Sequence, residues 1–142
     1  MNFTISELCA SSTAKKNNIA NIPQQLYIYD NMLNLIVHFL QPLRDKLQKP
    51  IIITSGYRCI KLNTLVGGVL NSGHTKGFCA DIYVPNMNVE QLFNFIATSN
   101  LKWTQLIEEH SRGSKWVHVD FNIKNLKCEK LKYIDGKYIK IV

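Results

Sequence analysis

Apolar residues recur at steps of three and four in several segments of the chain, which is the period of an α-helix. The longest such segment, DNMLNLIVHFLQPLRDKL, predicts an amphipathic helix that starts near Asp30. Its apolar stripe consists of Met32, Leu35, Ile36, Phe39, Leu40, Leu43 and Leu47. Pro42 should bend or divide this helix, because proline lacks the N–H that helical hydrogen bonding needs. His38 falls on the polar side, so we expect it at the surface.

Three shorter helices are predicted from capping signals and apolar stripes. Thr4 and Glu7 have the spacing of a capping box, which opens a short helix near the N-terminus. Asn88 and Gln91 repeat this spacing before a segment with one apolar stripe. Residues 59–66 form the third predicted helix, which stops at a pair of glycines.

Strands are predicted mainly in the second half of the chain. The β-branched run 51–54, which follows Pro50, indicates a buried strand. The other strand-like runs are 79–84, 104–108, 115–121, 130–134 and 137–142. Asp135-Gly136 joins the last two runs and is a strong hairpin signal. Because helices come early and strands late, we predict an α+β fold with a mainly antiparallel sheet flanked by helices.

Length and charge limit the class of protein. The 142 residues predict one domain over 1–142. No apolar run reaches about 18 residues and no secretory signal is recognisable, so we expect synthesis in the cytoplasm and no membrane insertion. The net charge of +7 favours anionic partners. The lysines are nevertheless spread along the chain and no Arg-rich helix occurs, so we expect solvated surface charge and no nucleic-acid partner.

The cysteines give neither a metal motif nor a redox motif. They lie far apart and form no C-x-x-C pair, so we expect reduced, mostly buried thiols. The four residues are Cys9, Cys59, Cys79 and Cys128.

The segment NSGHTKGFCADIYV contains a histidine and an aspartate seven positions apart. We expect Asp81 near the start of a strand and His74 in a loop between Gly73 and Gly77 that leads back over it. Such a loop lets the imidazole and the carboxylate meet. A structural alternative is that Asp81 caps the glycine loop through its backbone amides while His74 is merely exposed.

A third candidate ligand comes from KWVHVDF. Alternation in this strand sends Trp116, His118 and Asp120 to one face and the apolar residues to the core, so His118 faces a site or solvent. Two imidazoles and one carboxylate, here those of His74, Asp81 and His118, are a common ligand set of catalytic zinc. Asp120 could accept a hydrogen bond from a ligand imidazole or be exposed to solvent.

Two glutamates just before this strand favour a catalytic site. A hydrolase that uses a zinc-activated water needs a carboxylate as general base, which Glu108 or Glu109 could supply. Alternation does not choose between them, because both faces of the strand carry an apolar residue. His110 competes as a ligand, but EHSRGSK has the composition of a mobile loop, so we interpret His110 as a bystander.

The segment SGYRCIKLNTLVGGVLNSGHTKGFCADIYV, followed by QLIEEHSRGSKWVHVDF, resembles the zinc D-alanyl-D-alanine carboxypeptidase family. The similarity is greatest to compact phage and prophage members and more distant to the vancomycin-resistance D,D-dipeptidases. FTISELCASSTAKKNNIANIP and LQPLRDKLQKPIIITSGYR are similar too, so the resemblance covers nearly the whole chain. The most specific part of the resemblance is the pattern S-x-H-x-x-G-x-x-x-D, followed much later in the sequence by W-V-H.

The resemblance implies a hedgehog/D-Ala-D-Ala-peptidase-like fold and one Zn²⁺ per chain, held by His74, Asp81 and His118. It implies Glu109 as the general base, with Glu108 in reserve because QLIEEH places two glutamates side by side.

Two more residues are implied by the same resemblance. Arg58 of SGYR matches the position that faces the substrate carboxylate or the developing oxyanion, which makes it both catalytic and substrate-binding. Ser72 is implied to bind substrate. A buried structural role explains Arg58 poorly, because a lone arginine in a core would need a paired acid.

The implied function is zinc-dependent hydrolysis of peptide bonds in peptidoglycan stem peptides or cross-links that contain D-amino acids. The enzyme would be a D,D- or L,D-carboxypeptidase or endopeptidase that works as a monomer. Like a phage endolysin, it would reach the bacterial wall or periplasm after release. The alternative is a non-catalytic zinc-binding or virion-structural module of the same fold, which would lack a ligand or the base; this chain lacks neither.

Overall fold

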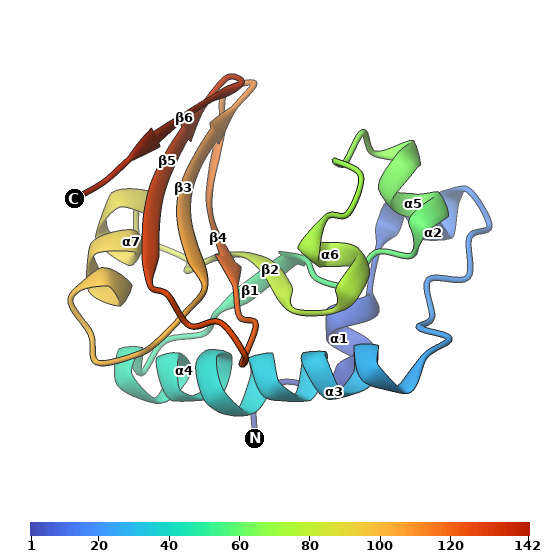
Figure 1. Cartoon of the computed structure of the whole chain (residues 1–142), viewed down its shortest axis with the longest axis horizontal. Helices are drawn as coiled ribbons and strands as arrows, with labels where there is room; N and C mark the ends of the chain where they lie inside the picture. The colour runs from blue at the N-terminus through green and yellow to red at the C-terminus, as the bar shows by residue number, and fades with distance from the viewer.

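The computed structural model describes residues 1–142 and contains one six-stranded sheet (Figure 1). Its strands are β1 (Ile52–Ser55), β2 (Cys79–Tyr83), β3 (Gln105–Ser111), β4 (Ser114–Asp120), β5 (Glu129–Ile134) and β6 (Lys137–Lys140). They lie in the order β1-β2-β4-β3-β5-β6. Only β3 and β5 pair in parallel; every other neighbouring pair is antiparallel. The predicted α+β class with a mainly antiparallel sheet is confirmed.

The helices are α1 (Ile5–Cys9), α2 (Ser12–Lys16), α3 (Leu26–Leu35), the π-helical η1 (Ile36–Leu40), α4 (Gln41–Leu47), α5 (Ile60–Leu65), α6 (Gly73–Lys76) and α7 (Val89–Ala97). The four predicted helical segments are all helical, and α2 and α6 were not predicted. The Thr4 hydroxyl accepts from the Glu7 N–H at 3.0 Å, which caps α1. Asn88 and Gln91 form the reciprocal capping box predicted at the start of α7.

The long amphipathic helix is present but starts earlier than predicted. It begins at Leu26, one turn before Asp30, and the preceding Gln25 makes no side-chain cap that the sequence could have signalled. Pro42 does not end it. Directly before the proline the helix widens into the π turn, where the Gln41 N–H bonds to the Ile36 carbonyl. This wider turn accommodates the Pro42 ring, because the proline nitrogen has no hydrogen to donate to the carbonyl four residues back.

One hydrophobic core holds the sheet and helices together. It consists of 23 buried residues, most of them from the long helix, α7 and one face of the sheet. Val117 and Val119 of β4 face this core as the alternation predicts. His38 is exposed, also as predicted, and its ring stacks on Phe121 with centroids 6.2 Å apart.

The first predicted strand differs from expectation. β1 is not buried: its residues alternate between exposed and half-buried, and Ile52 is 37% exposed. The cause is its place at the edge of the sheet, where it pairs with β2 alone. The buried isoleucine of this run is Ile51, just before the strand.

The segment predicted as a mobile loop around His110 is also different. β3 continues to Ser111 and β4 begins at Ser114, so a tight turn at Arg112 and Gly113 replaces the loop. Both turn residues have positive φ, of 50° and 80°. The predicted Asp135-Gly136 hairpin between β5 and β6 is confirmed.

All four cysteines are free thiols, as expected. Only Cys79 is buried, and the other three are half-buried, so the expectation of mostly buried thiols is wrong. No helix has the length and apolar character needed to cross a membrane.

Candidate active site

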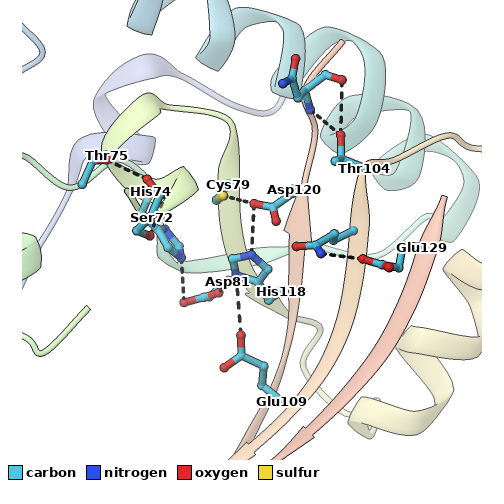
Figure 2. Close-up of polar contacts among 12 residues, drawn as sticks. Ser72, His74, Thr75, Cys79, Asp81, Thr104, Glu109, His118, Asp120 and Glu129 are labelled. Carbon is cyan, nitrogen blue, oxygen red and sulfur yellow. Dashed lines mark hydrogen bonds and ion pairs between the residues drawn. The ribbon is translucent and has the colours of Figure 1, made fainter. Parts of the chain in front are cut away.

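Sheet register brings three of the predicted site residues to one face. Asp81 on β2 lies opposite His118 on β4. On the other side of β4, Ile107 of β3 lies opposite His118, and Glu109 lies opposite Trp116. Because facing residues point to the same side of a sheet, the carboxylates of Asp81 and Glu109 share the face that carries the His118 ring (Figure 2). Asp81 stands in the middle of β2 and not near its start.

His74 reaches this face from α6, a one-turn helix where a loop was predicted. Asn31 on α3 donates to the Lys76 carbonyl at 2.8 Å and so ties α6 to the long helix. Gly77 ends α6 with a φ of +84°, and a Cβ there would lie 2.7 Å from the Ile28 carbonyl oxygen. The position of His74 over the sheet therefore depends on a glycine at 77.

Gly77→Ala should lower the free energy of unfolding by more than about 1 kcal/mol, because it combines backbone strain with a clash against α3. Denaturant unfolding of the metal-free protein measures this. Gly113→Ala is the matched control, since Gly113 also has positive φ (+80°) but has no atom near an added Cβ. Equal losses in the two variants would contradict the importance of the close contact.

His74, Asp81 and His118 converge on one point. Each offers one ligand atom, and these atoms lie within 4.8 Å of one another. His74 Nε2 is 3.5 Å from Asp81 Oδ2, and His118 Nδ1 is 2.8 Å from Asp81 Oδ1. The two imidazole rings meet edge to face with centroids 5.2 Å apart. The alternative of an exposed His74 is wrong, because this residue is only 3% exposed.

The second nitrogen of each ring is fixed by a neighbouring acceptor. His74 Nδ1 lies 2.7 Å from the Gly56 carbonyl oxygen, which can only accept, so Nδ1 carries the hydrogen. His118 Nε2 lies 3.2 Å from Asp120 Oδ1 (Figure 2). This pairing leaves His74 Nε2 and His118 Nδ1 free to bind a metal beside Asp81. Nitrogen and oxygen donors oriented in this way fit zinc.

The site carries excess negative charge. Burial alone would raise the pKa of Asp81, but His74 and His118 outweigh it and hold that pKa well below its usual range. Burial would lower the pKa of His118, yet hydrogen bonds to Asp120 and Asp81 raise it well above its usual value. Carboxylates that favour a proton on His118 in this way also favour a divalent cation at the same place.

The two glutamates point to opposite sides of β3. Glu109 Oε1 lies 3.8 Å from His118 Nδ1, and burial raises the pKa of Glu109 to about 6. Glu108 lies opposite Val117 on the core face. There it contacts His110 Nε2 at 2.5 Å and Lys132 Nζ at 3.4 Å. Sheet register thus separates two residues that alternation alone could not.

His110 belongs to a second acidic cluster on the far side of the sheet. Its ring, Glu108 and Glu90 also bring possible ligand atoms within 4.8 Å of one another. Lysines already occupy this cluster: Lys132 pairs with Glu108, and Lys115 pairs with Glu90 at 3.4 Å. Because these cations neutralise the carboxylates, we assign the cluster no metal.

Arg58 lies beside the site. Its backbone N–H donates to the His74 carbonyl at 3.0 Å, which fixes the start of its side chain. Burial lowers the pKa of Arg58, while nearby Asp81 and Glu109 counteract that shift. Its Nε is buried and has no hydrogen-bond partner. An unpaired buried donor near a metal-binding group suits a ligand that is bound only during function.

Ser72 has a structural contact in addition to its predicted one with substrate. Its hydroxyl is buried and accepts from the His74 N–H at 3.2 Å, so it caps α6. The structure thus shows Ser72 holding the helix that carries His74.

Sequence reasoning offered Asp120 as an acceptor for a ligand imidazole, which the contact with His118 bears out, but it missed Cys79. Cys79 Sγ donates to Asp120 Oδ1, the atom that also contacts His118. A Cβ on Gly73 would clash with Cys79 Sγ and would lie 2.7 Å from Asp120 Oδ1. Alternation along β2 places Cys79 on the face of Asp81, which was the only signal for its position.

Comparison with known families agrees with this geometry. A family model described as Peptidase M15 matches residues 1–120. The chain belongs to the peptidase M15 family. This is the family of zinc D-Ala-D-Ala carboxypeptidases, so the resemblance noted in the sequence is confirmed. Membership makes the chain a zinc-dependent peptidase with a peptide substrate. A search of curated proteins finds no match.

Proposed function

We propose that this M15 peptidase hydrolyses peptide bonds in peptidoglycan stem peptides or cross-links that contain D-amino acids. One zinc ion would be held by His74, Asp81 and His118. The observation that carries the proposal is the convergence of two oriented imidazole nitrogens and a carboxylate on the sheet face that also presents Glu109. The match to the peptidase M15 family supports the same reaction class.

Zinc bound there would supply Lewis acidity, which would acidify a water molecule and polarise the substrate carbonyl. Glu109 accepts the proton of that water and then returns a proton to the leaving amine. Its position 3.8 Å from His118 Nδ1 suits both steps, because it places the carboxylate beside the proposed metal ligands. Asp120 holds the His118 ring through Nε2, which would leave Nδ1 free to hold the metal.

Arg58 would bind the substrate carboxylate or stabilise the negative charge that grows on the attacked carbonyl. Ser72 would contact substrate while it caps α6. The unpaired Arg58 Nε supports this assignment, since a ligand oxygen would complete its hydrogen bonding.

Arg58→Lys should lower kcat/KM by more than about tenfold, because lysine keeps the charge but loses the planar set of donors. Steady-state kinetics on a peptidoglycan peptide measures the loss. Arg44→Lys, in the last turn of α4, is the matched control. Unchanged kinetics in Arg58→Lys would make Arg58 a structural residue.

Mass spectrometry of purified peptidoglycan fragments, before and after incubation with the zinc-loaded protein, tests the function. Cleavage at a bond next to a D-amino acid is the expected result, and the product masses separate D,D from L,D and carboxypeptidase from endopeptidase activity. Intact fragments beside a fully zinc-loaded protein would contradict the proposal and favour the non-catalytic module. We further propose that the enzyme acts as a monomer in the wall or periplasm after release from the cytoplasm.

A further inference from the structure

The C-terminal hairpin of β5 and β6 lies outside residues 1–120, the part matched by the family. It nevertheless extends the sheet directly beside β3, the strand that carries Glu109 (Figure 1). The hairpin is therefore placed to contribute residues to the active site that the family match does not cover.

Sheet register identifies those residues. Tyr133 on β5 lies opposite Glu109 on β3. Tyr138 on β6 lies opposite Tyr133. Since Glu109 shares its face with the His118 ring, both tyrosines project from the active-site face of the sheet.

Glu109 is thereby flanked by aromatic residues on both neighbouring strands, Tyr133 on one side and Trp116 on the other. The Tyr133 and Tyr138 rings lie 4.8 Å apart and are tilted by 60°. Tyr138 is 61% exposed, so most of its ring is open to a ligand. Trp116 Nε1 is buried and has no hydrogen-bond partner.

We propose that Trp116, Tyr133 and Tyr138 form an aromatic subsite for the part of the peptide substrate that extends beyond the bond being cleaved. The proposal rests on the proposed peptidase function. Aromatic rings bind aliphatic side chains and peptide planes over a large area at low cost in side-chain entropy. An extended peptide of small apolar residues fits this chemistry. The hairpin then selects longer substrates over shorter ones.

The hairpin provides its own matched control. Ile139 is next to Tyr138 but pairs with Lys132 and points to the opposite face, and it is also exposed (50%). A substitution at Ile139 therefore affects the stability of the hairpin without reaching the proposed subsite. Tyr138→Phe keeps the ring and removes only the hydroxyl.

The test compares kcat and KM of the zinc-loaded wild type, Tyr138→Ala, Tyr138→Phe and Ile139→Ala on a minimal peptidoglycan peptide and on one with two further residues. We expect Tyr138→Ala to raise KM for the longer peptide about tenfold and to leave kcat unchanged. The longer peptide should then no longer have a lower KM than the shorter one. Ile139→Ala should behave like the wild type, and Tyr138→Phe, which keeps the ring, should raise KM for the longer peptide less than Tyr138→Ala does.

Three results would overturn the subsite. The first is an unchanged KM in Tyr138→Ala, and the second is an equal loss in Ile139→Ala, which would mean that the hairpin acts only through stability. The third is a wild type that cleaves neither peptide, in which case the proposed function fails and the subsite falls with it. If the wild type cleaves the peptides and Tyr138→Ala has no effect, the subsite is overturned but the proposed function is not.

Discussion

Glu109→Gln should keep zinc bound and lower turnover by about 100-fold or more, the scale expected for loss of a positioned proton acceptor. The amide has nearly the same shape as the carboxylate but cannot take a proton from water. Zinc should remain because the proposed ligands are His74, Asp81 and His118, and the Glu109 carboxylate lies 3.8 Å from the nearest of their nitrogens. Metal content and kcat measured on the same preparation test both parts.

Glu108→Gln is the matched control, since it makes the same chemical change one residue away on the opposite face of β3. It should cost little turnover. It removes the negative partner of Lys132 and His110, so its effect should be on stability. If Glu108→Gln abolished turnover and Glu109→Gln did not, the base would be Glu108. If neither affected turnover, this strand would have no part in water activation.

The contrast between these glutamates shows what the sequence could and could not predict. Alternation in β4 correctly separated His118 from Val117, because one face of the sheet is a continuous core. In β3 the same reasoning failed, since Leu106 and Ile107 are both apolar and both buried. Which glutamate faces the site is determined by the pairing of β3 with β4, where Ile107 lies opposite His118 and Glu109 lies opposite Trp116. Such pairing joins residues far apart in the sequence and leaves no local signal.

The other differences between the predicted and the observed structure also arise from contacts between residues far apart in the sequence. The run 51–54 has the composition of a buried strand, and only the strand order reveals that β1 is an edge. The helix α6 has four residues, too few to be stable alone, and is held by Ser72 and by Asn31 of a distant helix. The helix starts at Thr4 and Asn88 and the Asp135-Gly136 turn were predicted correctly because their hydrogen bonds are local.

His118→Ala should lower zinc affinity by more than about 100-fold and abolish activity, because it removes one of three ligands from a site that no other imidazole can complete. Wild-type protein should hold one zinc per chain after gel filtration, and the variant should hold almost none, as measured by elemental analysis. His110→Ala is the control: this histidine lies on the same sheet and contacts Glu108 on the other face, so its loss should leave zinc content unchanged.

Loss of the His118 ring also leaves Asp81 and Asp120 without their shared partner, which could unfold the protein and so mimic loss of a ligand. Asp120→Asn separates the two effects. It keeps His118 in place and weakens the acceptor at Nε2, together with the Cys79 contact to the same oxygen, so zinc affinity should fall by about 10- to 100-fold in a protein that remains folded. Circular dichroism of the metal-free variants verifies folding. Full zinc occupancy in a folded His118→Ala protein would remove His118 from the metal site, and with it the convergence on which the proposed function rests.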